Sequence, residues 1–334
     1  MTQTVAAVHP EHVPTSWWFR QRTILILLAI LMVLLVIAGL LSADGFSSKL
    51  FFSTLLVAAP LGLLAAGQTL TMLTGGIDLS IAVIATGTAY VVGSQTSRVG
   101  GTGALLLGLL FVVVVGLVNG LAIGVFQVNP LIMTLGMSAI LIGFLTVGSQ
   151  SFLSGATNLP SIVGDVASGT FWIGIPRNFV IWILLGAAIL LIQRRMGYGR
   201  TLYAIGDNAG ASRLAGIRRW QVLVVVYVLS AILGGIAGLL LASRAGGVAG
   251  LQLADQLLLP SVAAAVIGGT SILGGVGGYA GTIVAVLCLT VLDKILTLVQ
   301  VGGSGSQDLK LITYGLVIVI LSWVYARVNG RSLR

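Results

Sequence analysis

The residue types that perform chemistry in enzymes are few in this chain and widely separated. Both histidines, His9 and His12, lie in the polar N-terminal stretch, while Cys288 is the only cysteine and Glu11 the only glutamate. Neither a Ser-His nor a Cys-His pair can therefore form inside the apolar sequence, and isolated acids do not make a carboxylate metal cage. No GxxxxGK[ST] run is present to cradle phosphates. We expect no catalytic residue, no metal site and no bound ATP in this chain.

The polar residues that could contact a solute lie within the apolar sequence or at its glycine-rich breaks. An acid in such a setting is costly to bury, which makes Asp78 a functional candidate, although it could simply N-cap a helix starting at Ser80. Amides and hydroxyls could offer a solute weak hydrogen bonds or could bridge helices, and glycines could serve close helix packing. The predicted translocation-path residues are Gln68, Thr69, Gly75, Gly76, Asp78, Asn119, Asn129, Gly268, Gly269 and Thr270.

A second candidate site is the basic stretch 194–219. Asp207 or Asn208 can N-cap one short helix that ends near Gly216. Positions 211, 214 and 215 of this helix carry apolar residues on a common face, which could dock on another protein. Alternatively, the arginines of the stretch only orient the chain in a membrane. The predicted docking residues are Asp207, Asn208, Ala211, Arg213, Leu214, Ala215 and Gly216.

The elements that must position these residues are membrane helices. The chain is 57% hydrophobic and 7% charged, far below the roughly 25% charged residues of soluble domains. A span needs about 20 apolar residues, so we expect about ten transmembrane helices in an all-α integral membrane fold. The ten apolar segments are Thr23–Leu41, Leu50–Leu73, Ser80–Ser94, Ala104–Phe126, Leu131–Leu153, Phe179–Ile192, Trp220–Ser243, Leu257–Ile267, Ala280–Leu298 and Leu309–Val328.

The charges predict how these helices are oriented. With the N-terminus inside, alternation places eleven of the 17 lysines and arginines on the cytoplasmic side, together with the stretch 194–219. We therefore expect cytoplasmic tails at 1–22 and 329–334 around a permease domain at 23–328. The net charge of +9 serves this orientation, so nucleic acid is not an expected partner. Five spans per half predict an inverted repeat, with the glycine-rich breaks near Gly75 and Gly268 as paired interruptions.

Several runs resemble, in the same order along nearly the whole chain, the permeases of the ribose, xylose and arabinose type ABC importers. The first runs are Thr74 to Ser80, Gly116 to Gly120, and the Asn129-Pro130 step followed by Thr134-Leu135-Gly136. The later runs are Tyr203 to Asn208, continued by Ala211 and by Arg213 to Ile217, and Gly268-Gly269-Thr270 with the glycines after it. The stretch 194–219 corresponds in this resemblance to the cytoplasmic segment that couples such permeases to their ATPase.

The resemblance implies a bacterial inner-membrane permease subunit that imports a monosaccharide. Its implied partners are a second permease copy or paralogue, ATPase subunits that bind ATP and magnesium, and an extracytoplasmic sugar-binding protein. A short helix held in a cleft of the ATPase could act as a lever. Two alternatives stay open. Related permeases carry branched-chain amino acids, nucleosides or signalling sugar derivatives, and broken helices in inverted halves also suit an ion-coupled secondary transporter.

Overall fold

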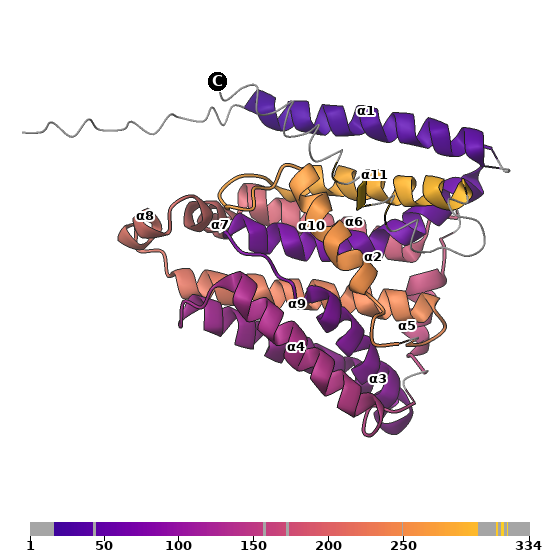
Figure 1. Cartoon of the computed structure of the whole chain (residues 1–334), viewed down its shortest axis with the longest axis horizontal. Coiled ribbons are helices and arrows are strands. Elements are labelled where there is room, and N and C mark those ends of the chain that lie inside the picture. Colours follow the sequence, from indigo (N-terminus) through magenta and orange to yellow (C-terminus); the bar gives the residue numbers. More distant parts are fainter. Residues whose placement is uncertain are drawn as a thin grey trace, which may run out of the picture.

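The computed structural model describes residues 17–299 without 43–44, 156–157, 172–173 and 249, plus residues 312, 315–316 and 319. Most of this part of the chain is helical. Helices are expected because lipid offers no partner to backbone amides and carbonyls. The helices (Figure 1) are α1 Trp17–Leu41, α2 Ser48–Leu73, α3 Ile81–Gly124, α4 Pro130–Ser149, α5 Ser161–Ser168, α6 Arg177–Arg195, α7 Gly197–Asp207, α8 Ala209–Leu214, α9 Arg219–Arg244, η1 Asp255–Leu257, α10 Leu258–Ile267 and α11 Tyr279–Leu298.

Seven of these helices are long and apolar enough to cross a membrane, which makes the chain a multi-pass membrane protein. The described residues contain no β-strand, in agreement with the predicted all-helical class. The predicted tenth segment, Leu309–Val328, lies almost entirely outside the described residues, as do the tail 329–334 and residues 1–16 of the tail 1–22. Helix α1 already begins inside that predicted tail, at Trp17.

The predicted segments Ser80–Ser94 and Ala104–Phe126 are the two arms of α3. Gly100 adopts φ 76° and ψ 165°, a conformation open to glycine, and the helix reverses there. The arms lie side by side because Gly108 contacts Val92 and Gly87 contacts Phe111. The 44-residue element is therefore a helical hairpin, so it can supply two membrane spans.

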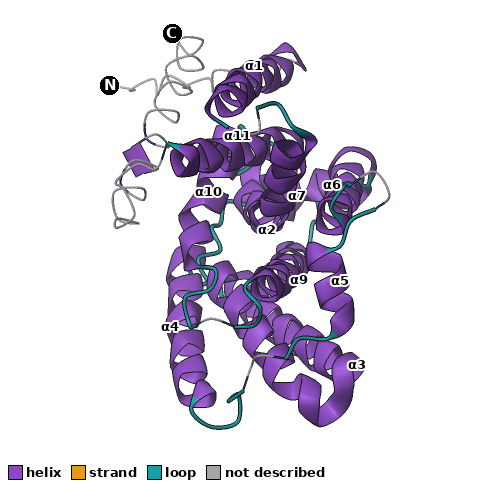
Figure 2. Ribbon diagram, turned by 90° about the vertical axis from the view of Figure 1, so that its right-hand side faces the viewer, coloured by secondary structure: helices purple, strands orange, loops and turns teal. Residues whose placement is uncertain are grey.

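Helix α9 lies between α2 and the α3 hairpin, as the view in Figure 2 shows. Three glycines four residues apart on the second arm of α3 face the α9 backbone. A Cβ on Gly116 would lie 2.6 Å from Cα of Val228, and the same contact recurs between Gly120 and Val224 and between Gly124 and Trp220. Small residues at this spacing let two helix backbones approach closely, so these glycines serve helix packing.

A proline inside α2 ties that helix to two others. Pro60 has no backbone N–H, so the carbonyl of Leu56, four residues earlier, loses its partner within the helix. Asn178 Nδ2 of α6 donates to this carbonyl at 2.9 Å, and an Arg244 guanidinium nitrogen of α9 donates to it at 3.3 Å. The missing helical hydrogen bond is thus replaced by two bonds between helices.

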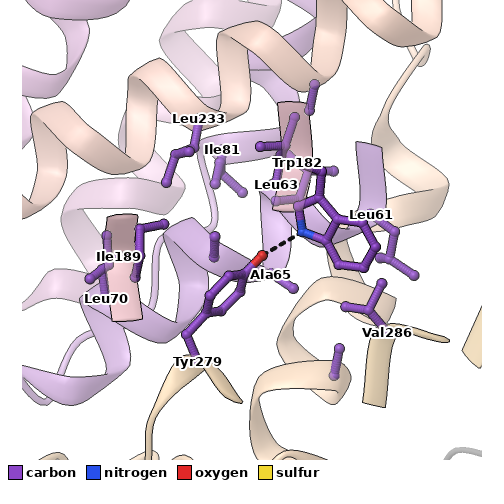
Figure 3. Close-up of a cluster of buried hydrophobic side chains, with 14 of the residues drawn as sticks. Leu61, Leu63, Ala65, Leu70, Ile81, Trp182, Ile189, Leu233, Tyr279 and Val286 are labelled. Atoms are coloured by element: carbon purple, nitrogen blue, oxygen red, sulfur yellow. Dashed lines mark hydrogen bonds between the residues drawn. The ribbon is translucent and has the colours of Figure 1, made fainter. Parts of the chain in front are cut away.

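The core between α2, α6 and α11 is largely apolar, and a chain of hydrogen bonds between polar atoms runs through it (Figure 3). The indole N–H of Trp182 donates to the Tyr279 hydroxyl at 2.6 Å, and that hydroxyl donates to the carbonyl of Gly62 at 2.7 Å. Gly62 leaves room for the indole, because a Cβ there would overlap the ring. Both aromatic side chains are fully buried with their polar atoms satisfied, which fixes the relative position of the three helices.

The two glycine-rich breaks lie on the same side of the bundle. The break of residues 74–80 joins α2 to α3, and the break of residues 268–278 joins α10 to α11. They touch, since the Gly275 amide donates to the carbonyl of Leu73 at 3.1 Å. The inverted repeat, with these two breaks as paired interruptions, remains a prediction.

Candidate coupling and translocation sites

Asp78 occupies a buried polar cluster where α2, both arms of α3, and α9 meet. Its carboxylate accepts hydrogen bonds from the Ser80 amide at 3.0 Å, the Ser80 hydroxyl at 2.6 Å and the Ser230 hydroxyl of α9 at 2.7 Å. Asn119 Nδ2 donates to the Ser80 hydroxyl at 3.0 Å, which adds the second arm of α3. Asp78 thus binds Ser80, the N-cap residue of α3, and joins it to α9.

The non-helical backbone around Asp78 is satisfied by side chains. Gln68 Nε2 donates to the Asp78 carbonyl at 2.7 Å, and Gln68 Oε1 accepts from the Asp78 amide at 3.3 Å. The Thr134 hydroxyl of α4 accepts from the Leu79 amide at 3.1 Å, and the Ser138 hydroxyl donates to the Leu79 carbonyl at 2.9 Å. Irregular backbone is tolerated within a membrane protein when it is buried and bonded in this way.

The remaining predicted path residues lie in several places. Thr69 faces α11, with its hydroxyl 2.9 Å from that of Thr282. Asn129 is exposed and N-caps α4, accepting from the Leu131 amide at 2.9 Å. Gly268 meets the backbone of Gly281 where α10 approaches α11. The structure therefore brings Gln68, Asp78 and Asn119 together and places Thr69 and Asn129 apart from them.

The glycines of both breaks and Thr270 complete the predicted path set. Gly75 faces the carbonyl of Leu273 in the other break, whereas Gly76 lies against the Tyr227 hydroxyl of α9. Gly269 closes α10 with φ 95°, and Thr270 is buried against Gly277. These residues build the breaks themselves and hold the two breaks close together.

The basic stretch contains two helices where the sequence predicts one. Asp207 does not start a helix but ends α7, so the proposed capping role falls to Asn208 alone. Asn208 Oδ1 accepts from the Ala211 amide at 2.9 Å, as expected of an N-cap, and Gly216 follows the helix with φ 80°. Helix α7 was not predicted, because the residues on its outer face are typical of a loop. Its apolar residues Leu202 and Ile205 are buried against the bundle.

Helix α8 projects beyond the bundle at one end of the molecule (Figure 1). Leu214 is 90% exposed, and Ala211 and Ala215 beside it are also exposed. The surrounding surface is basic. Its exposed arginines are Arg194, Arg195, Arg200, Arg213 and Arg218. The predicted apolar face of this helix is therefore not covered by any of the residues that the structure describes.

Some members of the buried cluster were not predicted from the sequence. Ser80 and Ser230 bind the Asp78 carboxylate, and the Tyr227 hydroxyl is buried near it without a partner among the described residues. A signal existed, because Tyr227 and Ser230 are three residues apart on an apolar helix and so share a face, as do Thr134 and Ser138 four apart. Such polar pairs on one helix face indicate buried contacts between helices.

Comparison with known proteins gives a consistent family. Residues 50–322 match the family described as "Branched-chain amino acid transport system / permease component". The ribose import permease protein of Bacillus subtilis is 33% identical over 261 residues, covering 78% of this chain and 79% of that protein. The fructose import permease protein of Rhizobium meliloti is 31% identical over 307 residues, covering 88% and 82%. The ribose import permease protein of Escherichia coli K12 is 29% identical over 334 residues, covering 96% of this chain and 98% of that protein.

No solved structure matches the chain significantly. The chain therefore belongs to this family of transport-system permease components, as its motifs predict.

Proposed function

We propose that this chain is the membrane subunit of an ABC importer that carries a monosaccharide across the bacterial inner membrane. The observation that carries the proposal is α8, a capped helix that presents an exposed Leu214 beyond the bundle. Relatives named as ribose and fructose import permeases support the same assignment. In this proposal ATP and magnesium bind separate ATPase subunits, and an external binding protein delivers the sugar.

The docking proposal follows from the shape of α8. A six-residue helix with both ends capped is a rigid projection. Burial of its exposed leucine by a partner removes apolar surface from water, which stabilises the complex. Ala211 and Ala215 on the same face let the partner approach closely, and Arg213 adds a charge at the edge. We propose that this surface enters a cleft of the ATPase, as a hydrophobic anchor with a polar rim would.

For the sugar path we propose the region beside the two breaks, in a complex with a second permease copy or paralogue. The hydrogen bonds of Gln68, Asp78 and Asn119 now hold helices together. These three polar side chains would become available to a sugar only when the breaks and helices shift. A sugar needs several weak hydrogen bonds rather than one strong site, and these polar side chains can supply them.

The transported solute has two specific candidates, a monosaccharide and a branched-chain amino acid. The family description names branched-chain amino acids, whereas the relatives from Bacillus subtilis and Rhizobium meliloti are named for ribose and fructose. We favour a monosaccharide because these relatives are similar over at least three quarters of the chain. Uptake of labelled ribose, fructose and leucine by cells expressing the complete transporter separates the two. Leucine uptake alone would overturn the sugar assignment.

The docking role is tested with Leu214→Asp in the assembled transporter. Loss of a central apolar anchor should weaken ATPase binding about 30-fold or more, measured by co-purification and titration of the ATPase, and abolish uptake. Ile162→Asp is the matched control, since Ile162 is 60% exposed on the short helix α5. This control should leave ATPase binding unchanged. Equal affinity of both variants for the ATPase would refute docking through α8. In a separate assay without the ATPase, uptake driven by an ion gradient would indicate a secondary transporter.

A further inference from the structure

Three chain segments meet backbone to backbone where α7 ends. They are the last turn of α7 at Gly206, the end of α2 at Leu73, and Gly275 in the break between α10 and α11. The Gly275 amide donates to the carbonyl of Leu73 at 3.1 Å, which joins the two breaks. The Tyr203 hydroxyl of α7 donates to the Gly277 carbonyl at 3.1 Å, which joins α7 to the second break.

Glycine is required on every side of this meeting point. A Cβ on Gly206 would overlap the Leu73 carbonyl oxygen and the Gly275 amide nitrogen. A Cβ on Gly274 would lie 2.9 Å from Cα of Gly206 and 2.9 Å from the Gly75 amide nitrogen. Gly75, Gly274 and Gly275 also have φ values of 80°, 94° and 71°, which disfavour any side chain. No side chain separates the segments, so α7 cannot move without displacing both breaks.

The junction is connected rigidly in both directions. Asn208 is the C-cap of α7 and the N-cap of α8, and its amide donates to the Ala204 carbonyl at 3.0 Å, so no free linker lies between the two helices. On the other side, the break after Leu73 leads within a few residues to Asp78, which is bonded to α9 through Ser230. Figure 1 shows this segment leaving α2 beside α7 and running to the start of α3.

We propose that Gly206 and Tyr203 are positioning residues that transmit the movement of α8 to both breaks at once. This inference rests on the proposed function, because it takes α8 as the site that the ATPase moves. It adds that the docking helix acts on the α2–α3 break and the α10–α11 break as one body. A side chain at Gly206 must separate α7 from the breaks, whereas the docking face at Leu214 stays intact.

The test compares Gly206→Ala with Gly197→Ala in the complete transporter reconstituted in vesicles. Both changes add one methyl group to α7, but Gly197 is exposed and a Cβ there meets only the Arg200 guanidinium at 3.9 Å. Gly206→Ala should keep ATPase binding and ATP hydrolysis while the number of solute molecules imported per ATP falls at least about fivefold, the lower end of typical coupling effects. Gly197→Ala should keep the wild-type ratio.

A milder variant, Tyr203→Phe, removes only the hydroxyl that binds Gly277 and should lower the same ratio about fivefold. If Gly206→Ala does not reach the membrane, Tyr203→Phe decides alone. A wild-type ratio of solute to ATP in Tyr203→Phe, or in a folded Gly206→Ala, would overturn the coupling role. Failure of the proposed function has a different signature, since the wild-type chain itself would then bind no ATPase.

Discussion

A single buried acid connects two helices of this permease. Asp78 has no exposed surface, and burial of an acid without partners is costly. Its three hydrogen bonds to Ser80 and Ser230 offset that cost, and they do so by joining the start of α3 to the middle of α9. The carboxylate therefore holds Ser80, the N-cap residue of α3, whose own side chain makes no capping hydrogen bond.

We predict that Ser230→Ala destabilises the protein more than a comparable serine change elsewhere. The substitution leaves one oxygen of the buried Asp78 carboxylate without its donor, which should cost about 1 to 3 kcal/mol of unfolding free energy. Ser261→Ala is the control, because Ser261 is equally buried but its hydroxyl donates to the Leu258 carbonyl of its own helix. Thermal unfolding in detergent measures both, and equal midpoints would contradict the prediction.

At the scale of helices, the carbonyl freed by Pro60 explains why α2, α6 and α9 hold their relative positions. In lipid an unpaired carbonyl is costly, so a proline in a membrane helix calls for donors from its neighbours. Asn178 and Arg244 supply them at Leu56. The proline thereby converts a bond within one helix into bonds among three.

This explanation predicts that changes at Pro60 and Asn178 are not additive. Asn178→Leu should cost about 1 to 2 kcal/mol in the wild-type chain, because the Leu56 carbonyl loses its closer donor. In a Pro60→Ala background the helical N–H returns, so the same change should cost less, with an interaction energy of about 0.5 kcal/mol or more. A double-mutant cycle of unfolding in detergent measures this energy. Additive effects would show that Asn178 stabilises the protein by other contacts.

At the scale of the whole molecule, the candidate docking helix α8 and the hairpin turn of α3 lie toward opposite ends of a long bundle. Helix α8 leads directly into α9 at Arg219, while the hairpin turn of α3 packs near the other end, where Gly101 contacts Pro160 and Gly164 lies near Ser243. The 26 residues of α9 separate these ends by about 39 Å at the 1.5 Å rise of a helix, enough to span a bilayer. The ends therefore belong on opposite sides of the membrane.

Thiol labelling checks which end is cytoplasmic. The native Cys288 is buried, so it should contribute little background. A membrane-impermeant maleimide should label Arg213→Cys in inside-out vesicles, because α8 is exposed at the end with most arginines. Ser97→Cys, at the exposed turn of the α3 hairpin, should label in right-side-out vesicles. The reverse pattern would overturn the predicted orientation and, with it, docking of a cytoplasmic ATPase on α8.

Much of the molecule follows from local sequence. The apolar segments predicted between Thr23 and Leu298 coincide with described helices, because a membrane helix satisfies its own backbone and needs only a run of apolar side chains. The Asn208 cap and the exposed face around Leu214 were also predicted, since capping and the three-to-four spacing act within one turn. The family motifs added the expected class of partner.

What the sequence by itself determined is therefore the membrane class, the helical segments, and the capped helix at the candidate docking site. Only the tertiary structure decided that the two breaks touch on one side, that Asp78 binds Ser230, and that Gly206 lies between Leu73 and Gly275. The physical reason is that these contacts join residues far apart in the chain. Helix periodicity and capping describe neighbours within a turn, whereas the meeting of three backbones depends on how whole helices pack.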